Sequence, residues 1–184
     1  DFHGSISDVV TLKAWDRTGG YANGEAGVPT IPSLTATLDT SGQARDVTLS
    51  LDGNTAYVAD KHGGLQIIDV SDSSNPTLIE TLDTSGSAYG VTFSPDGNTA
   101  YVADGTSGLQ IINVSNPSTP TVLGTLDTSG SAQSITLSPD GNTAYVADNN
   151  AGLQIIDVSD SSNPILIQTF DTSGSTISVI LSAD

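Results

Sequence analysis

The feature that most constrains the fold of this chain is a 44-residue internal repeat. The nonapeptide DGNTAYVAD begins at three equally spaced positions, which are Asp52, Asp96 and Asp140. The complete unit occupies residues 34–77, 78–121 and 122–165, and a fourth copy runs over residues 166–184. Repetition at such a period indicates one supersecondary unit that buries its apolar surface against copies of itself.

Each unit predicts four short strands and no helix. In the second copy the strands cover residues 78–83, 88–94, 99–104 and 108–115. They are rich in Val, Ile, Thr and Tyr, which favour strands, whereas Gly and Pro interrupt every stretch long enough for a helix. The Asp-Gly pair between the second and third strands is a hairpin signal. A four-stranded unit with a period near 44 is typical of a β-propeller blade.

The strands predict sheets that are apolar on both faces. In TAYVAD, Tyr101 and Ala103 point to one face, and Ala100 and Val102 point to the other. Such a sheet must be covered on both sides, and blades stacked around an axis achieve this. We therefore expect the repeated tyrosines, which are Tyr57, Tyr101 and Tyr145, in the core between blades. A two-sheet sandwich is the alternative, but it does not explain an identical four-strand unit.

The motif YVAD…GLQIIDVSD…NP resembles the LVIVD-repeat proteins, a family of predicted extracellular β-propellers. The segment SPDGNTAYVAD is similar to the YVTN-type propellers of surface-layer proteins and to their lactonase relatives. Together the resemblance covers residues 34–184 and implies a secreted, bacterial protein that is extracellular or on the cell surface. Residues 1–33 lie outside the repeat and read as a strand followed by a Gly/Pro-rich linker. Within them, VVTLKAWDRTGG resembles the end of a bacterial cadherin-like surface module.

Two models account for the incomplete fourth copy. In the first, which we favour, the chain is part of a larger propeller, with three full blades and the inner strand of a fourth. The missing Met at the start and the break inside a repeat favour this model. In the alternative the chain closes as a four-bladed propeller. The inner strand of blade four would then be residues 175–182, and its outer strands would come from residues 8–16 and 33–39.

Charge excludes several classes of partner. The formal net charge is −17, from 21 acidic and 4 basic residues. Four bases cannot neutralise a phosphate backbone, so nucleic acid and anionic membranes are poor partners. No apolar run approaches the length of about 20 residues that a membrane helix needs. The absence of Cys excludes disulfides and thiolate metal sites.

The two loop faces of the predicted blades differ in how well the copies agree. The PDGN hairpin and the SDSSNP loop are nearly invariant on one face. The opposite face, which carries the DTSGSA loop and the turn after YVAD, varies between copies. We therefore predict that this varied face binds a ligand, with neutral drift of exposed loops as the alternative. The candidate residues are Arg45, Asp46, Lys61, His62, Tyr89, Gln133, Asn149 and Asn150.

Calcium is the one cofactor that the sequence raises. Asp60, Asp104 and Asp148 end the same strand in successive copies, and Ca²⁺ prefers carboxylate oxygens, of which it needs several converging. The alternative is that each aspartate caps a turn by accepting backbone N–H groups.

No catalytic motif is present, and His3 and His62 are the only histidines. The sequence therefore predicts a non-enzymatic surface module for adhesion, scaffolding, or protein or glycan binding. An incomplete propeller would expose apolar blade faces and could self-associate. One alternative is a fragment of a lactonase-like or other hydrolytic propeller enzyme whose site lies in missing blades. The other alternative is a purely structural spacer.

Overall fold

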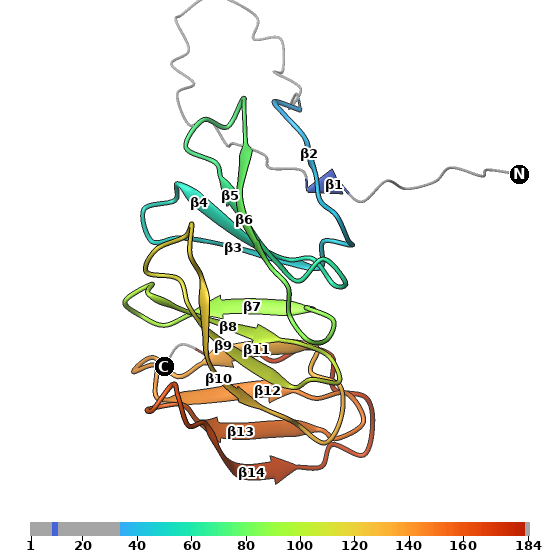
Figure 1. Ribbon diagram of the computed structural model, residues 1–184. Coiled ribbons are helices and arrows are strands. Elements are labelled where there is room, and N and C mark those ends of the chain that lie inside the picture. Colours follow the sequence, from blue (N-terminus) through green and yellow to red (C-terminus); the bar gives the residue numbers. More distant parts are fainter. Residues whose placement is uncertain (1–8, 11–33, 183–184) are drawn as a thin grey trace, which may run out of the picture.

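The computed structural model describes residues 9–10 and 34–182 and shows three four-stranded antiparallel sheets stacked in succession (Figure 1). Blade 1 contains β3 (Asp46–Leu49), β4 (Thr55–Ala59), β5 (Leu65–Asp69) and β6 (Thr77–Leu82). Blade 2 contains β7 (Gly90–Phe93), β8 (Thr99–Ala103), β9 (Leu109–Asn113) and β10 (Thr121–Leu126). Blade 3 contains β11 (Ser134–Leu137), β12 (Thr143–Ala147), β13 (Leu153–Asp157) and β14 (Ile165–Phe170). The all-β propeller architecture is thereby confirmed.

The strands of each blade pair in chain order, from the inner strand to the outer one. In the sequence, each repeat begins close to the outer strand of the preceding sheet. For example, β6 lies almost entirely in repeat 78–121 but pairs with β5 of blade 1. Each sheet therefore takes its last strand from the following repeat. No helix among the described residues is long and apolar enough to cross a membrane.

The core lies between the blades, as the alternation in TAYVAD predicts. We call the side of each sheet that points to the next blade its forward face, and the opposite side its rear face. Tyr57 and Ala59 on the forward face of blade 1 share a buried cluster with Ala100 and Val102 on the rear face of blade 2. The same positions one repeat later form the cluster between blades 2 and 3. Burial of Tyr57 and Tyr101, each 2% exposed, confirms their place between blades.

The forward face of blade 3 has no following blade among the described residues, and its side chains are less buried. Leu109 and Ile111 on the forward face of blade 2 are completely buried. Their counterparts on blade 3, Leu153 and Ile155, are only partly buried, and so is Tyr145. The expectation that all three repeated tyrosines are core residues is therefore correct for two of them.

The strand predicted over residues 175–182 does not form. Thr176 makes an isolated bridge to Asn149, and residues 177–182 belong to no strand. The physical reason is the missing ladder partner, because an inner strand pairs with the second strand of its own blade, as β3 pairs with β4. None of the described residues supplies such a second strand for residues 177–182.

The first residues do not complete a fourth sheet either. β1 (Val9–Val10) pairs with β2 (Leu38–Asp39) in a separate two-stranded sheet. The described residues therefore form an incomplete propeller of three blades, and the closed four-bladed alternative is not what they show. The rest of the predicted N-terminal strand and linker, and the resemblance to a cadherin-like module, lie outside the described residues.

The packing between blades predicts a difference between two matched substitutions. Ile111→Ala should lower the free energy of unfolding by about 2–5 kcal/mol, the usual cost of truncating a buried Ile. Ile155→Ala removes the same atoms at the same position of blade 3, and should cost distinctly less because Ile155 is partly exposed. Urea denaturation followed by circular dichroism measures both values. Equal losses would contradict the open forward face of blade 3.

Candidate binding site on the varied loop face

The two predicted loop faces are present. The hairpins that follow Ser50 and Ser94 lie together with Ser115 and Pro117 on one side of the stack, which we call the hairpin face. The turns after β4, β8 and β12 lie on the opposite, varied face, where they contact the loops that precede the inner strands.

Each predicted calcium ligand instead holds two loops of its own blade together. Asp60, Asp104 and Asp148 are 0% exposed. In each case one carboxylate oxygen accepts a hydrogen bond from a Thr hydroxyl at 2.7 Å. The other oxygen accepts one from a Gly backbone N–H at 2.7, 2.8 and 3.0 Å, respectively. This is the turn-capping role that the sequence left open as the alternative to calcium.

Burial sets the electrostatics of two of these carboxyls. Loss of hydration raises the pKa of Asp104 and of Asp148 above the ordinary value. The hydrogen bonds from Thr84 and Gly86 oppose this rise at Asp104, and those from Thr128 and Gly130 oppose it at Asp148. Among the described residues, no group of three or more His, Cys, Asp or Glu side chains could hold a metal ion. Calcium binding stays a prediction.

Two varied positions serve the backbone. Lys61 N–H donates to Ala88 O at 2.8 Å and Lys61 O accepts from Ala88 N–H at 3.1 Å, which joins blade 1 to the start of blade 2. Gly105 makes the same bridge to Ala132, and Asn149 makes it to Thr176. Lys61 and Asn149 adopt φ angles of 47° and 49°, in the left-handed region that favours Gly and Asn. The bridge thus fixes the backbone conformation at this position, which Gly105 and Asn149 adopt more readily than Lys61.

The start of the inner strand is also structural. One carboxylate oxygen of Asp46 accepts a hydrogen bond from Val91 N–H at 2.9 Å and so ties β3 to β7. At the equivalent place in blade 2, a Cβ on Gly90 would lie 3.1 Å from Ser134 Cα. Part of the variation between copies therefore reflects close contacts between inner strands.

Three of the predicted side chains, those of Arg45, Lys61 and Tyr89, gather at the junction of blades 1 and 2. The Arg45 guanidinium carbon lies 5.8 Å from the ring centroid of Tyr89, within the range of a cation–π contact. Gln43 Oε1 accepts from Arg45 Nη2 at 3.4 Å and from Lys61 Nζ at 3.3 Å. We call Gln43, Arg45, Lys61 and Tyr89 the basic cluster. It contains Arg45 and Lys61, which are the two basic residues (Lys or Arg) in the described part of the chain.

Sequence reasoning missed Gln43, although a signal was present, since the other copies carry Ser at this position. His62 lies nearby, with its Nδ1 3.3 Å from Ser87 Oγ. The hydrogen bonds of the described residues give this exposed imidazole no carboxylate partner that would orient it as a general base.

The other three candidates make their contacts at blade 3. Gln133 Nε2 donates to Ser131 Oγ at 2.9 Å, and Asn150 Oδ1 accepts from Ser175 Oγ at 3.1 Å. Together with the backbone bridge of Asn149, these contacts organise the turns of blade 3 and the segment that follows it. The eight predicted residues thus do not form one site.

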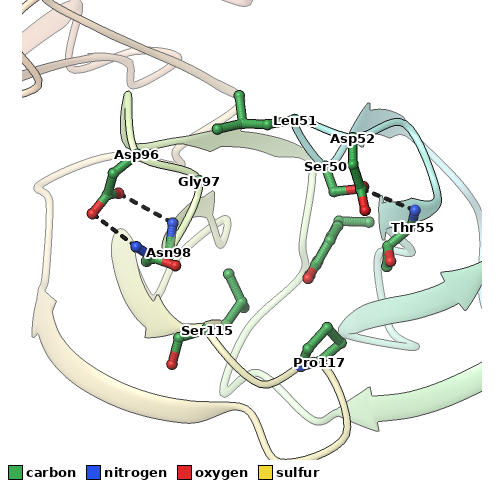
Figure 2. Close-up of a pocket in the computed structure, with 11 residues that line it drawn as sticks. Ser50, Leu51, Asp52, Thr55, Asp96, Gly97, Asn98, Ser115 and Pro117 are labelled. Carbon is green, nitrogen blue, oxygen red and sulfur yellow. Dashed lines mark hydrogen bonds between the residues drawn. The ribbon is translucent and has the colours of Figure 1, made fainter.

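The hairpin face carries a pocket that the sequence did not reveal. It lies between blades 1 and 2, with a volume of about 250 Å³, and its polar walls include Asp52, Asp96 and Ser115 (Figure 2). Leu51 lies at its rim (Figure 2). Asp52, Asp96 and Ser115 recur in every copy, so variation between copies gives no signal for this pocket.

The comparison with protein families follows the blade boundaries. A model of the LVIVD repeat matches residues 41–84, 85–128 and 129–172. Each matched segment contains the four strands of one sheet. The chain belongs to the LVIVD-repeat family. No curated protein matches the sequence.

Solved structures confirm the propeller fold of this LVIVD-repeat chain. A proposed 6-phosphogluconolactonase from Bacteroides fragilis aligns over 76% of this chain and 43% of its own, with a TM-score of 0.68 and 18% identity. The Cps50 (Swd1) β-propeller domain of Myceliophteria thermophila aligns over 72% of this chain and 44% of its own, with a TM-score of 0.60 and 15% identity.

A chain of the mitotic checkpoint complex aligns over 78% of this chain and 44% of its own, with a TM-score of 0.65 and 17% identity. This LVIVD-repeat chain therefore spans less than half the length of each of these three structures. At such low identity the likeness shows the fold alone.

Aspartates in the exposed turns predict that acid destabilises the fold. In each of them a hydrogen bond from a Ser hydroxyl makes the largest contribution to lowering the pKa below the ordinary value of 3.8, and one from a backbone N–H makes the next largest. These aspartates are Asp52, Asp69, Asp72, Asp96, Asp140, Asp157 and Asp160. A pKa lowered by folding stabilises the folded state above pH 3.8, and this stabilisation is lost as the pH falls through the lowered pKa. Asp104 and Asp148 act in the opposite sense, because their pKa values are raised.

The test compares melting temperatures on both sides of pH 3.8 in the wild type and in a triple variant with Asp52→Asn, Asp96→Asn and Asp140→Asn. Asn keeps the shape of the turn and removes the titration. We expect the melting temperature of the triple variant to fall less steeply with acid. An identical acid dependence would show that these turns do not control it.

Calcium has its own test. A melting temperature that rises with CaCl₂ and returns with a chelator would support calcium binding, because a ligand of the native state stabilises it. Asp104→Asn, which keeps the size of the side chain, should then reduce the rise if the predicted ligands are correct. Identical melting with CaCl₂ and with chelator would remove calcium as a cofactor.

Proposed function

We propose that this LVIVD-repeat chain is a non-enzymatic binding module, acting outside the cell or on its surface, that binds a protein partner through the varied face. The observation that carries the proposal is the basic cluster. It places two cationic side chains, an aromatic ring and an amide side by side on a face whose other loops differ from copy to copy. Propellers of similar fold also occur within protein assemblies, as the mitotic checkpoint complex illustrates.

The chemistry of the basic cluster favours an acidic partner segment. An Arg guanidinium binds a carboxylate through two parallel hydrogen bonds. Arg45 is already positioned by Tyr89 and Gln43, which reduces the entropy lost when a carboxylate binds. In a chain with a net charge of −17, this cluster is also a local site of opposite charge, so binding should weaken as salt is added.

Two alternatives remain as predictions of their own. An acidic glycan would use the same groups, with Tyr89 stacking on a sugar ring. A lactonase-like or other hydrolytic function would require residues beyond the basic cluster, and turnover of a lactone or ester by this chain would support it.

The test measures binding of a Glu-rich peptide and of an acidic oligosaccharide by calorimetry at low salt. The paired substitution Arg45→Ala and Tyr89→Ala should weaken peptide binding about tenfold to hundredfold, since a hydrogen bond to a charged group contributes about 1.5–3 kcal/mol. Ser118→Ala, on the hairpin face, is the control and should bind like the wild type. Unchanged peptide binding in the double variant would refute the proposal. Binding of the oligosaccharide alone would favour the glycan alternative.

A further inference from the structure

The two ends of the blade stack are complementary to each other. Each internal junction joins one forward face to one rear face, and the residue types at the two junctions correspond at a spacing of 44 residues. The forward face uses Tyr57, Ala59, Leu65 and Ile67 in blade 1, and Tyr101, Ala103, Leu109 and Ile111 in blade 2. The rear face uses Ala100, Val102, Ile112 and Val114 in blade 2, and Ala144, Val146, Ile156 and Val158 in blade 3.

The faces left over at the two ends carry the same residue types. Blade 3 presents a forward face of Tyr145, Ala147, Leu153 and Ile155, and blade 1 presents a rear face of Ala56, Val58, Ile68 and Val70. These two faces lie at opposite ends of the stack (Figure 1). Since the two faces cannot meet within one stack, a junction of the same chemistry between them joins two molecules.

The margins of the two end faces are exposed, whereas the centre of the rear face of blade 1 is buried, because Leu38 and Ala44 of the same chain pack on it. On the rear side of blade 1, Val47 is 44% exposed, whereas its counterparts Val91 and Ile135 are 5% and 8% exposed inside the two internal junctions. On blade 3, Phe170 is 59% exposed, whereas its counterparts Leu82 and Leu126 pack against the internal clusters. Both ends of the stack therefore expose apolar side chains whose counterparts are more buried at the internal junctions, as expected of an association site.

We propose that the forward face of blade 3 packs on the rear face of blade 1 of a second copy of this chain. Two such junctions, related by a twofold axis, would close two copies into a six-bladed ring. Six blades fall within the usual range of about four to eight, whereas three copies would give nine, so we expect a dimer.

Two segments of each chain, β2 and residues 177–182, occupy positions that strands of the other copy would take in this junction. β2 lies where the outer strand of a preceding blade would lie, because Leu38 packs against Ala56, Val58 and Ile68. It is two residues long and pairs only with β1 among the described strands. Residues 177–182 correspond to β3 but form no strand. β14 and β3 are instead held in complete four-stranded sheets, so the dimer would keep β14 and β3 and displace β2 and residues 177–182.

The first test is the molar mass of the full chain in solution, measured by light scattering over a series of dilutions. We expect twice the monomer mass of 18.7 kDa at high concentration. Val47→Asp should give the monomer mass, because it places a charge in the junction. The matched control is Val122→Asp on the outer edge of blade 2, where Val122 is 49% exposed, and it should stay dimeric. Circular dichroism verifies that both variants are folded. A monomeric wild type, or a dimeric Val47→Asp variant, would overturn the proposal.

The second test fixes the register and benefits from the absence of Cys. In the internal junctions Lys61 bridges Ala88 and Gly105 bridges Ala132, so across the proposed junction Asn149 of one copy should bridge Ala44 of the other. The variant with both Ala44→Cys and Asn149→Cys should form a disulfide-linked dimer on oxidation, and neither single variant should. A linked dimer from either single variant would indicate face-to-face pairing and overturn the head-to-tail arrangement. An unlinked double variant in a dimeric sample would overturn the register.

Discussion

The packing of one blade face on the next is the interaction on which the rest of this structure depends. Every sheet is apolar on both sides, and burial of one large aliphatic side chain contributes about 1.5–3 kcal/mol. Leu65 and Ile67 are completely buried only because blade 2 covers them, and Leu109 and Ile111 only because blade 3 does. The same requirement explains why Leu153 and Ile155 are partly exposed, and why the two ends of the stack are the surfaces on which association is proposed.

Hydrogen bonds on the varied face complement this packing and are of two kinds, those within one blade and those between blades. The buried aspartates, such as Asp104 with Thr84 and Gly86, hold loops within one blade. The bridge between Lys61 and Ala88 holds one blade to the next. Because these contacts use mostly backbone atoms and residues shared by all copies, the side chains of Gln43, Arg45 and Tyr89 are free to differ. A face built in this way can change these side chains without changing its fold.

Copy-to-copy variation was a useful but incomplete guide to the site. It selected Arg45, Lys61 and Tyr89, which the structure brings together, and it could have selected Gln43 as well. It also selected Asp46 and Asn149, whose contacts tie strands and turns together. The pocket escaped notice because its polar walls, such as Asp52 and Asp96, recur in every copy. The strand predicted over residues 175–182 was wrong because β-propensity does not supply a pairing partner.

The sequence by itself determined the strands, their order within a blade, the two apolar faces and the two kinds of loop, because each depends on residues close together in one repeat. The tertiary structure alone decided which of the repeated residues are buried, since Tyr101 and Tyr145 occupy identical sequence contexts and differ only in having a neighbouring blade. It also decided that Arg45 and Tyr89, 44 positions apart, are in contact. Contacts between repeats depend on how the sheets stack, and no single repeat encodes that geometry.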